Sequence, residues 1–510
     1  MISPAEDAWT KEEAAHLLNR AGFGATIKEV ETLHAMGRRQ AVEYLLTERP
    51  DPNAETWPKW ANEQMLAEKS RERFEAIRQF RQTSRNLSEQ ELDRKRREAI
   101  QKFQQEERRN GLEAQVWWLK SMLTSPNPLK EKMTLFWHDH FATSFQKVKE
   151  PTFLMLQHRL FREHALGNFK SLTHAVARDA AMTLYLDTQN SRKGKPNENF
   201  ARELMELFTL GQGHYTEEDI RQSARAFTGY NLDRRTGKVS QQKNQWDDGD
   251  KTFLGKTGRF DGDGIIDVIF GQEQASRYLS MKLWEYFAYE NPPDTAVVAL
   301  GKTLAAAKFE IKPLLREIFL SKEFYAPECM ANQIKSPVQF LVQSLKQLET
   351  PMVPPAYALY VQSQLGQILF APPNVAGWDW GKAWINTNTL FTRYQISGSL
   401  TKGGKNPSAD QGMGKAKGFA GGGGMGGMQS ALEFSWQGPD FEAIVPRAMR
   451  DDLPLLVDAL IERFFHRKLP DKVRESFMAY AAEKKGVVFT NQEIAELVHL
   501  MMSTPHYQLC

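Results

Sequence analysis

Apolar residues recur along most of the chain at the three- and four-residue spacing of an amphipathic helix. Capping residues, prolines and glycines mark where these periodic segments begin and end, as at Asn127-Pro128, which is typical of a helix N-terminus. Residues 231–264 lack this period, and short hairpin strands fit the pattern there around Gly237 and Gly258. The pattern therefore predicts a predominantly α-helical protein: one large multi-helix domain with long irregular loops and at most a minor β-hairpin.

Two segments differ in composition from the rest of the chain. Residues 61–110 are dense in Arg, Glu, Lys and Gln and carry two thin apolar stripes, which predicts a charged helical hairpin. Residues 401–430 are rich in Gly and Met and cannot bury a core, which predicts a flexible insertion. We therefore expect a main helical domain over residues 1–400 that includes the hairpin, then the insertion, and then a C-terminal helical segment, residues 431–510, that packs on the main domain.

Charge and cysteine content narrow the class of protein. The chain of 510 residues carries 66 Lys and Arg against 63 Asp and Glu, and its net charge of +3 gives no nucleic-acid signature. No apolar run approaches the ~20 residues of a membrane span, and the N-terminus shows no apolar leader. The two cysteines, Cys329 and Cys510, cannot build a disulfide framework. We therefore expect a protein without a membrane span in a reducing, cytoplasmic compartment.

The helix predicted at residues 198–210 has the most suggestive polar face. Its apolar residues fall on one arc, and Asn199, Arg202 and Glu203 fall on the opposite one. On a cleft wall, Glu203 would act as a general acid or base, Arg202 would lower the pKa of a neighbouring carboxylate, and Asn199 would orient a substrate. The same spacing is also typical of an ordinary surface helix with i,i+4 ion pairs, and both interpretations stay open.

Two histidines lie in the helix predicted to follow Asn127-Pro128. On that helix His138 and His140 lie about 200° apart, so they cannot both bind one metal ion without distortion. We therefore predict no metal site here. One of the two histidines facing a cleft would be a candidate acid/base group, whereas the alternative is a buried core histidine.

Acidic residues cluster in two loops, at 246–251 and 260–267. A calcium loop of the EF-hand type would need Gly and Glu at two positions where this chain has Ile266 and Gln272. That interpretation fails, and Asp263 is instead expected to cap the following helix.

The loop that begins at Pro372 is rich in Trp and in side chains that form hydrogen bonds. Trp with Asn and Asp is the combination with which sugar-binding clefts stack rings and bind hydroxyls. The alternative is that the buried indoles fasten a long loop to the body. The candidate substrate-binding residues are Trp378, Asp379, Trp384, Asn386 and Arg393.

Several segments taken together carry a family resemblance. They are HLLNRAGFG (16–24), MTLFWHDHFATS (133–144), ARDAAMTLYLD (177–187), PNENFARELMELFTLG (196–211), YTEEDIRQSARAFTGY (215–230), DDGDKTFLG (247–255), IKSPVQFLVQSL (334–345) and PPNVAGWDWGKAWINTNTLFTR (372–393). The combination resembles a large bacterial family known as domain of unknown function 1800 (DUF1800). The resemblance implies one predominantly helical fold over nearly the whole chain and no established activity. Family members often carry an export signal, which makes a periplasmic or envelope-associated location the alternative.

Three functional hypotheses follow. The first is an enzyme with a polar, Trp-lined cleft that acts by acid/base chemistry, a hydrolysis or group transfer, on a saccharide or peptide-like polymer. The second is a non-catalytic helical binding or assembly protein of the bacterial envelope, with the hairpin at residues 61–110 as the surface for a protein partner. The third is a metal- or cofactor-binding protein, whose cofactor the sequence does not identify.

Overall fold

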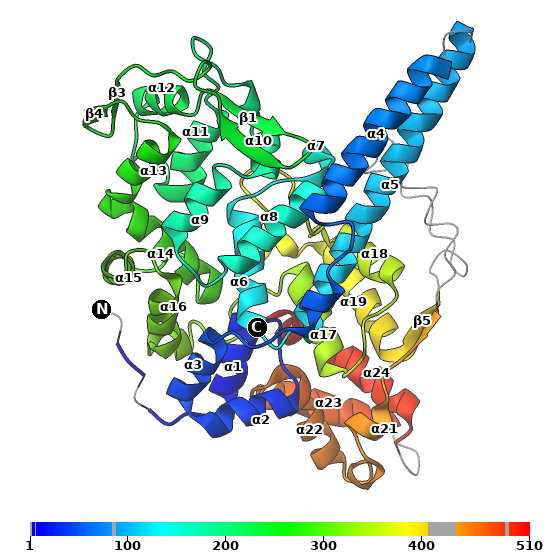
Figure 1. Cartoon of the computed structure of the whole chain (residues 1–510). Coiled ribbons are helices and arrows are strands. Elements are labelled where there is room, and N and C mark those ends of the chain that lie inside the picture. Colours follow the sequence, from blue (N-terminus) through cyan, green and yellow to red (C-terminus); the bar gives the residue numbers. More distant parts are fainter. Residues whose placement is uncertain (1–2, 6, 84–87, 406–434, 485–488) are drawn as a thin grey trace.

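The computed structural model of the protein describes residues 3–5, 7–83, 88–405, 435–484 and 489–510. Figure 1 shows that these residues build a predominantly helical body from which one helical hairpin projects. The strands in the described part of the chain form three small two-stranded antiparallel sheets. The predicted fold class is therefore confirmed.

The projecting hairpin consists of α4 (Glu63–Thr83) and α5 (Glu89–Thr124) (Figure 1). The second helix is longer than predicted, because it continues past residue 110 into the body, where Trp118 is fully buried. Near the body, Arg73 of α4 donates a hydrogen bond of 2.8 Å to the buried carboxylate of Glu107 in α5. This ion pair joins the two helices at the base of the hairpin.

The helices of the body bury amphipathic faces against one another. Those before residue 230 are α1 (Lys11–Ala21), α2 (Ile27–Met36), α3 (Arg38–Leu46), α6 (Pro128–His140), α7 (Phe145–Val148), α8 (Pro151–Glu163), α9 (Phe169–Val176), α10 (Ala180–Tyr185), α11 (Asn199–Glu203) and α12 (Glu217–Ala226). Those after it are α13 (Gly262–Phe270), α14 (Glu273–Phe287), α15 (Asp294–Ala306), α16 (Ile311–Leu320), α17 (Pro337–Gln347), α18 (Pro355–Leu365), α19 (Thr387–Lys402), α21 (Phe441–Ile444), α22 (Leu453–Phe465), α23 (Asp471–Lys484) and α24 (Asn491–Met502). Short 3₁₀ turns are η1 (Pro52–Thr56), η3 (Thr188–Asn190), η5 (Glu323–Tyr325), η6 (Gly381–Trp384), η8 (Arg447–Met449) and η9 (Pro505–Gln508). Among the described helices, none has the length and apolar character needed to cross a membrane.

The three sheets are short hairpins at the surface of the helical body. Their strands are β1 (Tyr230–Asp233), β2 (Lys238–Gln241), β3 (Lys251–Phe253), β4 (Lys256–Gly258), β5 (Gly403–Lys405) and β6 (Ser435–Gln437). In the first sheet Tyr230 lies opposite Gln241, and Gly237 has the positive φ of +70° that the connecting turn requires. The first two sheets fall in the segment where the sequence predicts hairpin strands, whereas no sequence pattern predicts the third.

The last helices lie against the middle of the chain. Helix α24 packs against α19, and the hydroxyl of Tyr507 lies 2.9 Å from that of Ser344 in α17. The backbone N–H of Lys335 donates a hydrogen bond of 2.8 Å to the carbonyl of Gln508. The predicted insertion at residues 401–430 falls largely outside the described residues.

Two local predictions need correction. The helix predicted at residues 198–210 begins at α11 but continues as a π-helical turn, η4 (Leu204–Thr209), in which the N–H of Leu210 reaches the carbonyl of Met205. The side chain that caps α13 is Asp261, whose carboxylate accepts the N–H of Gly264 at 2.9 Å. Asp263, the predicted cap, instead binds Arg178.

Candidate functional site

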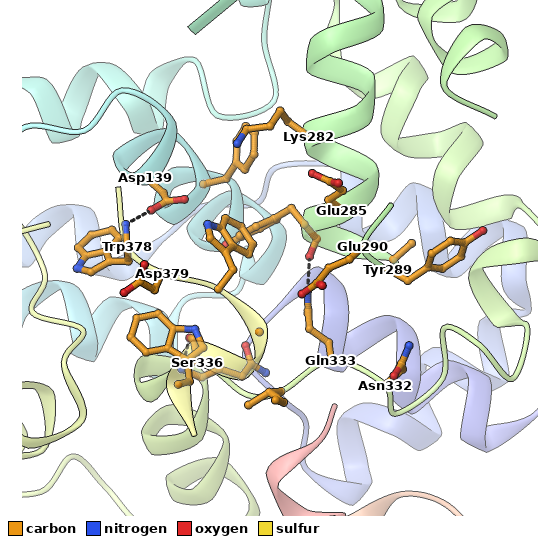
Figure 2. Close-up of a pocket in the computed structure, with 18 of the residues that line it drawn as sticks. Asp139, Lys282, Glu285, Tyr289, Glu290, Asn332, Gln333, Ser336, Trp378 and Asp379 are labelled. Atoms are coloured by element: carbon orange, nitrogen blue, oxygen red, sulfur yellow. Dashed lines mark hydrogen bonds between the residues drawn. The ribbon is translucent and has the colours of Figure 1, made fainter. Parts of the chain in front are cut away.

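A cavity of about 1050 Å³ lies between α6, α14 and the Trp-rich loop (Figure 2). Its volume is that of a site for a small ligand or a short stretch of polymer. Helix α6 lines the cavity with one stripe of side chains at the spacing i, i+3, i+4, i+7 and i+8. This stripe consists of Lys132, Leu135, Phe136, Asp139 and His140. One face of a single helix therefore forms a continuous wall of the site.

The Trp-rich loop docks on α6 through its backbone. The N–H of Trp378 donates a hydrogen bond of 2.7 Å to Oδ1 of Asp139. Gly377, with φ +91°, permits this approach, because a Cβ at this position would lie 2.7 Å from the backbone oxygen of Asp139 and closer still to Oδ1. The loop thereby covers Asp139 and closes one side of the cavity.

The carboxyl group of Asp139 has a pKa well above that of an ordinary aspartate. Burial raises its pKa to about 7, and the negative charge of Asp379 adds to that effect. Hydrogen bonds from the Trp378 backbone and the Trp380 side chain, together with the positive charge of Lys282, lower the pKa but do not cancel the effect of burial. Asp139 still keeps part of its surface accessible, so that a ligand in the cavity can reach it.

His140 contributes a neutral imidazole to the same wall. Burial lowers its pKa to about 3, with a smaller contribution from Lys282. Its Nε2 lies 2.9 Å from the carbonyl oxygen of Phe208, which can only accept, so Nε2 carries the proton. Nδ1 is then a hydrogen-bond acceptor, and no partner for it lies in the described part of the chain.

The π-helical turn η4 supplies the carbonyl that orients His140. The carbonyls near a helix C-terminus lack partners within the helix. Here the carbonyl of Phe208 accepts a hydrogen bond from His140, and the carbonyl of Leu207 accepts one of 3.0 Å from the hydroxyl of Tyr278. Of this segment, Leu207 lines the cavity, whereas its polar side chains do not.

The indoles of the loop differ in how much surface they offer to a ligand. Trp378 and Trp384 line the cavity but are only 4% and 8% exposed. Trp380 is 38% exposed and lies edge-on against Tyr286, with ring centroids 5.2 Å apart. Trp380 is therefore the indole best placed to stack against a bound ring.

Asn199, Arg202 and Glu203 lie outside the cavity. Arg202 forms two hydrogen bonds of 3.0 Å with Glu217 and pairs with Glu198 at 3.4 Å. Burial, with the negative charge of Glu206, raises the pKa of Glu203. Arg202 therefore belongs to an ion-pair network with Glu198 and Glu217, away from the cavity.

Three further candidates hold the fold together in the structure. His138 is buried against Trp118, with Nε2 2.9 Å from Nδ1 of His158, and burial lowers its pKa to about 3. Asn386 caps α19 by accepting the N–H of Thr389. Arg393 is 1% exposed, and its partners are the carbonyl of Lys335 and the side chain of Gln508. Of the residues that the sequence singles out, the cavity thus gathers His140, Trp378, Asp379 and Trp384.

Sequence reasoning missed Asp139, Lys282 and Trp380 as candidates. Asp139 stands between the two histidines of FWHDHF, a spacing that suggests metal ligation more readily than a carboxyl group in a cavity. Its helical spacing from Lys132 was the available signal, because residues seven apart share one face of a helix. Lys282 carries no such signal in an otherwise ordinary amphipathic helix.

The acidic loops offer no arrangement typical of a metal site. Asp247 pairs with Arg225 at 2.8 Å, and Asp248 pairs with Lys193 at 2.6 Å. Among the residues that the structure describes, no group of three or more His, Cys, Asp or Glu side chains is placed to hold a metal ion.

Fold and site together define a predominantly helical protein with a polar, aromatic-lined cavity. The chain belongs to the family described as "Protein of unknown function (DUF1800)", whose model matches residues 16–509. The resemblance seen in the sequence motifs is therefore confirmed, and this family description assigns no activity. Comparison with curated proteins and with solved structures gives no match.

Proposed function

We propose that the protein is an enzyme that performs acid/base chemistry, a hydrolysis or group transfer, on a saccharide or peptide-like polymer bound in the cavity. The observation that carries the proposal is Asp139, a carboxyl group on the cavity wall whose pKa is raised to about 7. Near neutral pH such a group is populated in both its protonated and ionised forms, so it can donate or accept a proton in the reaction.

The neighbours of Asp139 fit supporting roles. In its protonated form Asp139 would donate a proton to the leaving group. His140 would stay neutral beside Asp139, and Lys282 would stabilise negative charge that develops in the cavity. Trp380 would stack on a sugar ring or on a planar peptide group.

Replacing Trp380 by Ala tests whether the cavity is the binding site. We expect the substitution to weaken binding of an oligosaccharide or peptide about tenfold, because stacking contributes on the order of 1 kcal/mol beyond the buried area. The measurement is the dissociation constant of each ligand. It is obtained by calorimetric titration of the protein with a panel of neutral oligosaccharides and acetylated peptides.

Trp60→Ala is the matched control, since Trp60 is partly buried outside the cavity, where it donates to Glu113. It should leave the affinity unchanged. Wild-type affinity in Trp380→Ala, or no binding by any member of the panel, would contradict the proposed function.

The hairpin supports a second candidate function, that of a binding or assembly protein. Phe74, Ile77 and Ile100 are 69%, 54% and 50% exposed on the projecting α4–α5 hairpin (Figure 1). Large apolar side chains on an arm that leaves the body are typical of a surface for a protein partner. This proposal is independent of the chemistry of the cavity.

A triple variant, Phe74→Ser with Ile77→Ser and Ile100→Ser, tests the second candidate. We expect it to lose a defined partner that the wild-type protein captures after cross-linking, while it keeps its melting temperature because these side chains are not buried. A variant that retains every partner of the wild-type protein would show that the hairpin is not the docking surface.

A further inference from the structure

Four basic side chains form a buried wall beside the cavity. Lys132 lines the cavity and is 7% exposed, while Arg20, Lys335 and Arg393 are each 1% exposed. We call these four residues the basic wall. Their hydrogen-bond acceptors include backbone carbonyls and the side-chain oxygens of Gln339 and Gln508, all of which are uncharged.

The basic wall has donors that the protein leaves unused. In the part of the chain that the structure describes, Nε and Nη1 of Arg20, Nζ of Lys335 and Nε of Arg393 have no hydrogen-bond partner. A buried cation that lacks a counter-charge is costly, because it has lost its hydration without gaining an equivalent interaction. These donors lie behind the residues that line the cavity, so they would act on an anion at Lys132 through their positive charge and not by direct hydrogen bonds.

The cations of the wall also act on one another. Burial, with a smaller contribution from the positive charge of Arg20, lowers the pKa of Lys132 to about 8. Burial likewise lowers the pKa of Lys335 to about 7, with Arg393 acting in the same direction. Cys510 acts on the pKa of both lysines in the opposite direction but does not cancel the effect of burial. Lys132 is the member of the basic wall that lines the cavity.

The rest of the charged lining argues against a polyanionic ligand. The acidic residues besides Asp139 are Glu285, Glu290, Glu323, Glu328 and Asp379, three of which are labelled in Figure 2. A chain of anionic groups would be repelled by these carboxylates. A ligand with one anionic end and an uncharged or cationic remainder fits both parts of the lining.

We propose that the cavity binds peptides by their free C-terminal carboxylate, which Lys132 receives at the basic wall. This inference rests on the proposed function and selects the peptide from its two substrate classes. Lys132 and Asp139 are seven residues apart on α6, which corresponds to about 10 Å along the helix axis. An extended peptide covers that distance in about three residues. Asp139 would therefore act about three residues from the carboxyl end.

Two peptides that differ only in the terminal group test the proposal. Acetyl-tetra-alanine with a free carboxylate and the same peptide as its C-terminal amide are titrated into the full-length protein by calorimetry. We expect the acid to bind at least about tenfold more tightly at low salt, which is the effect of one charge-assisted hydrogen bond. The preference should shrink as salt is added, since screening weakens the charge interaction.

The variant Lys132→Met tests whether Lys132 causes the preference for the peptide with a free carboxylate. Met has a similar length, and removing a buried charge in favour of an apolar side chain usually preserves stability, which a melting curve checks. We expect the variant to bind acid and amide equally. Lys382→Met, which removes an exposed lysine that lines the same cavity, should keep the preference.

Equal affinity of the two peptides for the wild-type protein would overturn the inference, as would a preference that survives in Lys132→Met. If oligosaccharides bind and neither peptide does, the carboxylate site is wrong while the proposed function stands. If nothing binds, both fail. The comparison of acid and amide on the wild-type protein tests the inference even where a variant does not fold.

Discussion

Replacing Asp139 by Asn is expected to lower kcat/KM by about 10²- to 10⁴-fold, the usual contribution of a general acid or base. Asn is nearly isosteric and can still accept the hydrogen bond of Trp378, so the loop should stay in place. It cannot transfer a proton, and the loss should therefore appear in the chemical step. The measurement is kcat/KM for a substrate identified from the oligosaccharide and peptide panel, together with a melting curve.

Asp248→Asn provides the matched control for this substitution. Asp248 is an exposed carboxylate that binds Lys193 at 2.6 Å and does not line the cavity. Its replacement should leave both kcat/KM and the melting temperature at wild-type values. Wild-type activity in Asp139→Asn would contradict the role assigned to Asp139, and equal losses in both variants would point to a non-specific effect.

Gly377→Ala is expected to have the second largest effect, because it forces the loop away from α6. The new Cβ would collide with Asp139, and a positive φ of +91° is itself unfavourable for Ala. We expect a loss of about 1–3 kcal/mol in the free energy of unfolding, the usual cost of a strained backbone position. Ligand binding and activity should fall as well, because Trp378 and its neighbours would no longer close the cavity.

Gly194→Ala is the control that separates the effect of backbone strain from the effect of the collision between residue 377 and Asp139. Gly194 has a similar φ of +80°, but no atom lies within 4 Å of the position that its Cβ would take. This variant should lose a comparable amount of stability to strain and keep full ligand affinity. If Gly377→Ala also kept full affinity, the loop would not be part of the site.

Much of the fold could be predicted from the sequence, because the residues that begin most helices lie next to those helices in the chain. Asn127-Pro128 precedes α6 as the sequence predicts, and a capping box of Ser88 and Glu91 begins α5. The π-helical turn after α11 could not be predicted, since it depends on partners distant in sequence. His140 and Tyr278 bind the carbonyls of that turn, and neither lies in the segment itself.

The site was harder to predict because burial decides its chemistry. His138 and His140 look equivalent in the sequence, yet only His140 lines the cavity. Asp139 resembles an ordinary helical carboxylate in the sequence, but burial raises its pKa in the structure, where a loop 239 residues away packs against it. Asn386 and Arg393 looked like ligand-binding groups, but their partners in the structure belong to the protein. A local pattern shows which side chains are available and not which of them share a cavity.

The raised pKa of Asp139 is the central claim, and the pH dependence of stability tests it without a substrate. A carboxyl whose pKa is about 7 in the folded protein and about 3.9 in the unfolded chain favours folding fully below pH ~4. That contribution is lost as the pH rises from about 4 to about 7. Asp139→Asn has no such proton, so its stability relative to wild type should increase over this range, by on the order of 4 kcal/mol in the limit.

The decisive measurement is the free energy of unfolding of wild type and Asp139→Asn between pH 4 and pH 8. A difference that grows in favour of the variant with rising pH is the predicted result. A difference that stays constant would show that Asp139 has an ordinary pKa, and the acid/base role proposed for it would then be wrong.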